Sequence, residues 1–176
     1  MKLFLISVFI VLGAAIPALG QSAKQTPKTY DFSTWDYEMC RAKGRFQDLE
    51  YCSQKVVDQI VADGKPAIPV LISQITDPRW LKEPVFDYWP RIRRGELAHF
   101  ILSDLFLDDT WEHSTMPDLF PDAHCDSHTP ASACWAKFRE THSLKEIQSR
   151  WMKFWKANRD RIYWDAKARC FRLSKR

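Results

Sequence analysis

Residues 64–77 of the chain read GKPAIPVLISQITD, and this stretch decides the fold. It opens with a glycine and a proline, a combination typical of a turn. Apolar side chains then recur three or four positions apart, at Ala67, Ile68, Leu71, Ile72 and Ile75. That spacing is typical of one face of a helix, and Pro69 falls in the first turn, where its missing N–H has no helical partner. We therefore predict a helix that ends before Pro78.

The segments on either side of this stretch carry helical patterns of their own. From Leu49 to Asp63 two apolar rows recur at the same spacing, and Gly64 is placed to end that helix. The two rows are Cys52, Val56 and Ile60, and Leu49, Val57 and Val61. From Ile92 to Leu107 the chain is apolar almost all round, which predicts a helix at the centre of the domain.

The segments farther out are less regular. Ser33 or Thr34 is a suitable cap for a first helix, running through Trp35 and stopping at Gly44. The aromatic, proline-punctuated stretch from Arg79 to Pro90 suits a packed loop.

The C-terminal part predicts helices followed by a short hairpin. Residues 131–141 are expected to be helical, with Trp135 and Phe138 on one side. Ser143 and Glu146 make a capping box for a last helix. One face of that helix carries Leu144, Ile147, Trp151, Phe154 and Trp155. Two short apolar segments, 162–164 and 170–173, then predict a β-hairpin. The expected fold class is mostly α: a small closed helical domain with this hairpin at its end.

The N-terminus has the order of a secretory signal. A basic start at Lys2 is followed by an apolar run from Leu3 to Ile16 and by small residues up to Gly20. The run is shorter than the roughly 20 residues that cross a bilayer, so cleavage is favoured over a retained anchor. We expect residues 1–20 to be a signal peptide, 21–32 a flexible lead-in and 33–176 a single domain. The protein is then secreted or periplasmic, with no membrane attachment after cleavage.

The charge distribution of the chain gives no indication of a nucleic-acid partner. The formal net charge of +4 becomes +3 without Lys2, and no long basic run occurs along the chain. The only local excess is the C-terminal tip, Arg169 to Arg176, which is typical of a solvated end. Nucleic acid is therefore not indicated as a partner.

Five cysteines remain in the mature chain, and in an oxidising compartment cysteines usually pair. The two bridges that the spacing favours are Cys40–Cys52 and Cys125–Cys134. Cys170 is then left over, although five cysteines allow other pairings that the sequence does not exclude.

Residues 64–77, with Gly64, the two prolines and the apolar row, resemble the second helix and inter-repeat turn of a HEAT-type repeat. Arg93, Arg94, Ala98 and Leu102 are similar to positions of the next repeat. The resemblance covers about residues 60–105 and departs from the family in the aromatic insertion 80–89, in the bulky His99 and Phe100, and in the absence of a third unit. It implies HEAT-like central helices in a scaffold that usually binds other proteins and carries no inherited active site.

One segment is rich in side chains that can bind a metal ion. Asp109, His113, His124 and His128 lie in a region, 108–134, that is rich in Asp, His and Pro. Imidazole and carboxylate groups can hold zinc, so a small metal-dependent hydrolase is one hypothesis for this loop. The spacing matches no named zinc signature, and the other interpretation is a surface loop pinned by Cys125–Cys134.

Other catalytic patterns are weak. Glu96 and His99 lie three apart and share a helix face, as in carboxylate-bridged metal bundles, but no second Glu-x-x-His occurs in the chain. A hydrogen-bonded core histidine is therefore the favoured interpretation. Neither a G-x-S-x-G elbow nor a glycine-rich phosphate loop is present.

Eight tryptophans are the remaining feature. Trp80, Trp89 and Trp111 fall in expected loops. A packing role in the core or the loops is the favoured interpretation for each, because small domains use large aromatic side chains to fill space. Any that are exposed would mark a binding face, because tryptophan is enriched where binding energy concentrates. The favoured function is thus an exported helical module that binds another protein, such as an inhibitor or immunity-type protein. It has no evident catalytic site and no cofactor. The alternative is the zinc-dependent hydrolase of loop 108–134.

Overall fold

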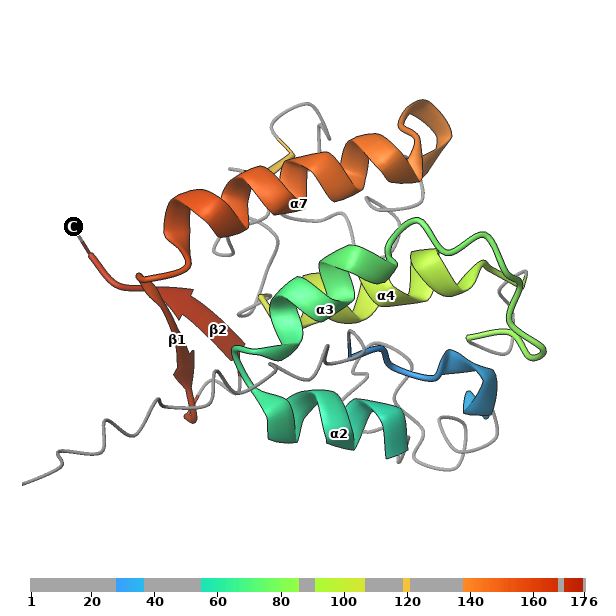
Figure 1. The fold of residues 1–176 in the computed structure, drawn as a ribbon, viewed down its shortest axis with the longest axis horizontal. Coiled ribbons are helices and arrows are strands. Elements are labelled where there is room, and N and C mark those ends of the chain that lie inside the picture. The colour runs from blue at the N-terminus through green and yellow to red at the C-terminus, as the bar shows by residue number, and fades with distance from the viewer. Residues whose placement is uncertain are drawn as a thin grey trace, which may run out of the picture.

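The computed structural model describes residues 28–36, 55–85, 91–106, 119–120, 138–167 and 170–175. Its elements in chain order are η1 (Phe32–Thr34), α2 (Lys55–Asp63), α3 (Ala67–Gln74), α4 (Arg94–Asp104), α7 (Leu144–Asn158), β1 (Ile162–Asp165) and β2 (Cys170–Leu173) (Figure 1). The predicted fold class, mostly helical with a short C-terminal hairpin, is confirmed. Among the residues described, no helix combines the length and apolar character needed to span a bilayer.

Helix α3 is the centre of the domain. It contacts α2, α4 and α7, and in Figure 1 it lies between α2 and α7. Its apolar row is fully buried, as the spacing in residues 64–77 predicts: Ala67, Ile68, Leu71 and Ile72. Burying four such side chains contributes several kcal/mol, at roughly 1.5–3 kcal/mol for each large aliphatic group.

Helix α2 ends at Gly64, which has a φ of 61° and donates its N–H to the carbonyl groups of Ile60 and Val61. A left-handed residue at this position is the usual end of a helix, and glycine adopts it without strain. Of the two predicted apolar rows, Val56, Val57 and Ile60 are buried. Val61 is 39% exposed, because α2 packs mainly on α3 and its buried face is narrower than the sequence pattern suggests.

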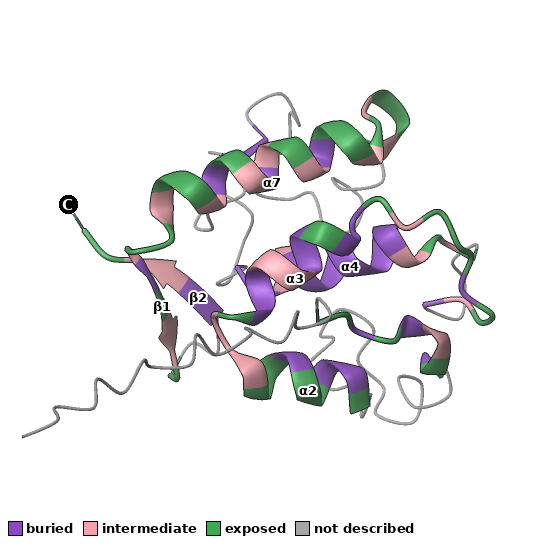
Figure 2. Cartoon of the chain, viewed as in Figure 1, coloured by how far each residue is buried: buried purple, intermediate pink, exposed green. Residues whose placement is uncertain are grey.

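Helix α4 is buried all round, as predicted. Every residue from Gly95 to Leu102 is buried, including Glu96 and His99 (Figure 2). Its first turn lies directly against the end of α3. A Cβ atom on Gly95 would overlap the carbonyl oxygen of Ile75, so only glycine permits this approach.

Replacing Gly95 by alanine tests this contact. Overlap with backbone atoms cannot be relieved by a rotamer change, so we expect Gly95→Ala to lower the free energy of unfolding by about 2 kcal/mol or more. Urea denaturation measures it.

Gly64→Ala is the matched control, because a Cβ there meets nothing within 4 Å. Its loss should be only about 1 kcal/mol, from the left-handed backbone. Equal losses in the two variants would contradict the close approach of α3 and α4.

The C-terminal elements follow the sequence pattern. Ser143 and Glu146 form the predicted capping box, and Ile147, Trp151 and Phe154 of α7 are buried. β1 and β2 form the predicted antiparallel hairpin. The hairpin is attached to the end of α4 by the hydrogen bond from the N–H of Phe171 to the carbonyl of Leu105.

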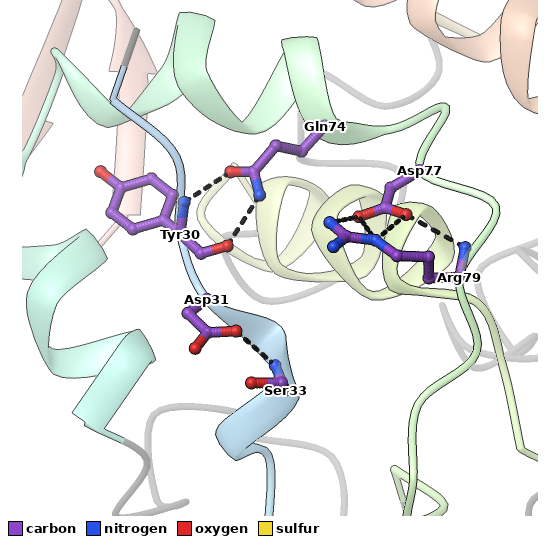
Figure 3. A network of polar contacts seen from close by, with 6 residues as sticks. All are labelled: Tyr30, Asp31, Ser33, Gln74, Asp77 and Arg79. Carbon is purple, nitrogen blue, oxygen red and sulfur yellow. Dashed lines mark hydrogen bonds and ion pairs between the residues drawn. The ribbon is translucent and has the colours of Figure 1, made fainter. Parts of the chain in front are cut away.

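The N-terminal expectations need correction. The sequence places a lead-in over 21–32, yet Tyr30 and Phe32 are buried. The reason is Gln74 of α3, whose side chain accepts from the N–H of Tyr30 and donates to its carbonyl (Figure 3). This exchange of two bonds docks the segment 28–36 as a neighbouring strand would.

The expected first helix also differs. The cap is Asp31, which accepts from the N–H of Ser33, and it begins only the 3-10 turn η1. Trp35 has an extended backbone, so a helix does not run from Ser33 or Thr34 through Trp35. Residues 37–54 lie outside the part described.

Candidate binding surface

A short antiparallel ladder precedes α4 and carries Trp80. The N–H of Leu81 donates to the carbonyl of Ile92 at 3.0 Å, and the N–H of Arg94 donates to the carbonyl of Arg79 at 2.7 Å. Trp80 and Arg93 lie opposite each other between these two bonds. The sequence predicts a packed loop here, and Leu81 and Val85 are indeed buried, but the pairing itself is an additional feature.

The position of the two bonds decides where the side chains lie. Because the bonds flank the Trp80–Arg93 pair instead of joining it, this is a non-hydrogen-bonded pair, in which opposing side chains are closest and share a face. The guanidinium carbon of Arg93 lies 5.4 Å from the centroid of the Trp80 ring, within cation–π range. Trp80 is 57% exposed, more than any other large hydrophobic side chain among the described residues.

Asp77 fixes the start of the ladder. Its carboxylate accepts from the backbone N–H of Arg79 at 3.0 Å and from the guanidinium of the same residue at 2.6 to 3.1 Å (Figure 3). The Arg79 guanidinium lowers the pKa of the Asp77 carboxyl. The carbonyl of Asp77 accepts from the N–H of Gly95, so one residue joins the ladder to the first turn of α4.

Glu96 fixes the other side of the ladder. Its carboxylate accepts from the backbone N–H of Arg93 and forms an ion pair with Arg139. Glu96 is buried, and a buried carboxylate needs such partners. Burial lowers the pKa of Arg139, with a further contribution from the nearby charge of Arg93.

Several exposed cationic residues lie close in sequence to Trp80. Lys82, Arg91 and Arg93 are exposed, and none of them has a carboxylate partner within the described part of the chain. Arg79 is neutralised by Asp77, and Glu83 is the one exposed acid in the described residues of 79–94. The Trp80–Arg93 pair is therefore aromatic and cationic, while the exposed Asp31 interacts electrostatically with Arg79 and Arg94 of the same ladder.

The backbone groups of Trp80 have no hydrogen-bond partner among the described residues. In a non-hydrogen-bonded pair the N–H and C=O groups point away from the opposing strand. The groups of Arg93 are taken up by Glu96 and Leu97, whereas no hydrogen bond in the described residues uses the N–H or C=O of Trp80. The ladder therefore ends in an edge that can still pair.

His99 belongs to the core and not to this surface. The indole N–H of Trp151 donates to Nδ1 of His99 at 2.8 Å, so the ring proton sits on Nε2, which donates to Ser103 Oγ at 3.0 Å. The Ser103 hydroxyl in turn donates to the His99 carbonyl. The favoured interpretation, a hydrogen-bonded core histidine, is confirmed.

We expect the free energy of unfolding to fall at acidic pH because of His99. Complete burial holds its pKa well below the ordinary value of 6.5. The unfolded chain takes up a proton below pH 6.5 and the folded chain does not, so this stabilisation is present above pH 6.5 and lost as the pH falls. From pH 7.5 to 5.5 we expect a loss of about 1 kcal/mol in the free energy of unfolding, measured by urea denaturation.

The control is His99→Gln, whose stability should depend less on pH by that amount. Carboxyl groups with lowered pKa values, such as Asp77 and Glu146, titrate below this window. An equal loss in the variant would show that His99 is not the group responsible.

The remaining predicted site residues lie outside the part of the chain that the structure describes. They are Trp89 and Trp111 of the binding set, Asp109, His113, His124 and His128 of the zinc hypothesis, and Cys40, Cys52, Cys125 and Cys134 of the two disulfides. These assignments stay predictions. Cys170 is buried in β2.

Within the described residues, no group of three or more His, Cys, Asp or Glu side chains is placed to hold a metal ion. No family model matches the chain, and no curated protein or solved structure shows significant similarity to it. The case for function therefore depends on the surface itself.

The sequence indicates Trp80 as a candidate binding residue, but not Asp77 or Arg93. The available signal was the string of cationic residues on both sides of the aromatic stretch. The pairing of 79–81 with 92–94 brings those residues to one face, and periodicity does not reveal such a pairing.

Proposed function

We propose that this protein is an exported helical module that binds another protein through the face built on Trp80 and Arg93. The observation that carries the proposal is a large aromatic ring, more than half exposed, held against an arginine. Tryptophan and arginine are the residue types most enriched at the energetic centres of protein interfaces.

The construction of the face favours binding. Two backbone bonds, the Asp77–Arg79 contacts and the Glu96 contact hold Trp80 and Arg93 in place before any partner arrives. A surface that is already ordered loses less conformational entropy on binding. The contacts of Asp77 and Glu96 thus keep the exposed Trp80 ring in a fixed position, which supports a role in binding.

Two features of the sequence support the same proposal. The signal-like N-terminus, residues 1–20, favours a secreted or periplasmic protein. The HEAT-like pattern of residues 60–105 implies a protein-binding scaffold with no inherited active site. An inhibitor or immunity-type protein combines export, small size and a single binding face.

Site-specific crosslinking tests the proposal. A photoreactive benzoylphenylalanine replaces Trp80 in the full chain, which is exported from its native host and irradiated. We expect one crosslinked partner protein from the exported fraction, because position 80 lies at the centre of the proposed interface.

The control carries the same group at Tyr163, an aromatic residue of β1 that is 46% exposed. It should give no such product. Equal crosslinking at 80 and 163, or none at 80, would contradict a binding face at Trp80.

A further inference from the structure

We propose that the partner supplies an extended acidic segment, which pairs with the open edge at Trp80 and places a carboxylate on Arg93. This inference rests on the proposed function and specifies the chemistry of the partner. Three observations carry it: the direction of the Trp80 backbone groups, the geometry of the Arg93–Trp80 contact and the charge of the surrounding face.

The unpaired backbone groups of Trp80 favour a partner segment in extended conformation. Arg79 and Leu81 use their carbonyl and N–H toward residues 92–94, so those of Trp80 point to the opposite edge. One residue of an incoming antiparallel strand can exchange two hydrogen bonds with Trp80. Strand addition of this kind gives affinity through the main chain, while side chains on the shared face give specificity.

The Arg93 side chain favours a partner segment that carries a carboxylate. A residue paired with Trp80 presents its side chain on the face that already holds the Trp80 ring and Arg93. No hydrogen bond or ion pair of the Arg93 guanidinium is found among the described residues, and its N–H groups match a carboxylate with two parallel hydrogen bonds. Asp77 and Glu96 are already engaged by Arg79 and by Arg139, and Asp31 interacts electrostatically with Arg79 and Arg94.

The surrounding charge points the same way. Lys82 and Arg91 are exposed close to the pair in sequence and have no carboxylate partner in the described residues. An extended segment with acidic side chains at alternate positions would meet these cations as well, whereas a basic segment would be repelled.

The experiment uses defined peptides and the full chain. The probe is a fluorescein-labelled peptide of alternating threonine and glutamate, compared with its threonine–glutamine counterpart by fluorescence anisotropy. We expect the glutamine peptide to bind about tenfold more weakly or worse, since a hydrogen bond to a charged group contributes roughly 1.5–3 kcal/mol. A glutamate peptide with N-methylated backbone should also bind more weakly, because it loses the strand pairing.

Variants connect the effect to the surface. Trp80→Ala and Arg93→Gln should each weaken binding of the glutamate peptide about tenfold, and Arg93→Lys should fall between Arg93→Gln and the wild type, because it keeps the charge but loses the planar fork. The matched controls are Tyr163→Ala and Arg159→Gln, the latter an arginine at the end of α7 with a side chain 63% exposed. Both should bind as the wild type does. Thermal unfolding confirms that each variant is folded.

Several results would overturn the inference: no binding of the glutamate peptide, equal binding of the glutamine peptide, or equal losses in Arg159→Gln and Arg93→Gln. Displacement of the peptide by a heparin hexasaccharide or an oligothymidine at lower concentration would also overturn it, in favour of a general polyanion site. If Trp80 crosslinks a partner but the peptides show no acidic preference, the proposed function stands and this inference fails. If neither the crosslinking nor the peptide binding gives the expected result, both the proposed function and this inference are wrong.

Discussion

The close approach of Gly95 to the carbonyl of Ile75 is the contact on which the rest of this structure depends. It lets the first turn of α4 lie against the end of α3, so the N–H of Gly95 reaches the carbonyl of Asp77. Asp77 then fixes Arg79, and the residues after it pair with those just before α4. The exposed Trp80–Arg93 pair is thus a consequence of how two core helices meet.

The fold was largely accessible from the sequence because its signals are local. Helices α3, α4 and α7 each carry an apolar pattern that is complete within about 15 residues, and the glycine after α2 and the Ser143 capping box mark ends by short-range chemistry. The N-terminal segment was not accessible in this way. Tyr30 is held by Gln74, 44 positions away, and no local pattern encodes such a bond.

The candidate surface was accessible only in part, for the same reason. Trp80 stands out as an aromatic residue in a proline-punctuated stretch. Its partner Arg93 becomes apparent only from the backbone pairing of residues 79–81 with 92–94. The two carboxylates that hold the ladder in place are Asp77, before the ladder, and Glu96, inside α4. The sequence pairs Glu96 with His99 because they lie three apart on one helix, yet their contacts are separate: Glu96 bonds Arg93 and Arg139, and His99 bonds Trp151 and Ser103.

Amide hydrogen exchange in the free full chain tests whether the ladder is ordered and its edge at Trp80 is unpaired, because it reports on each backbone N–H separately. The N–H groups of Leu81 and Arg94 are hydrogen-bonded across the ladder, whereas that of Trp80 has no partner in the described residues. We expect slow exchange at Leu81 and Arg94, with Trp80 exchanging close to the rate of an unstructured peptide. Protection at Trp80, or fast exchange at both Leu81 and Arg94, would contradict an ordered ladder with an open edge.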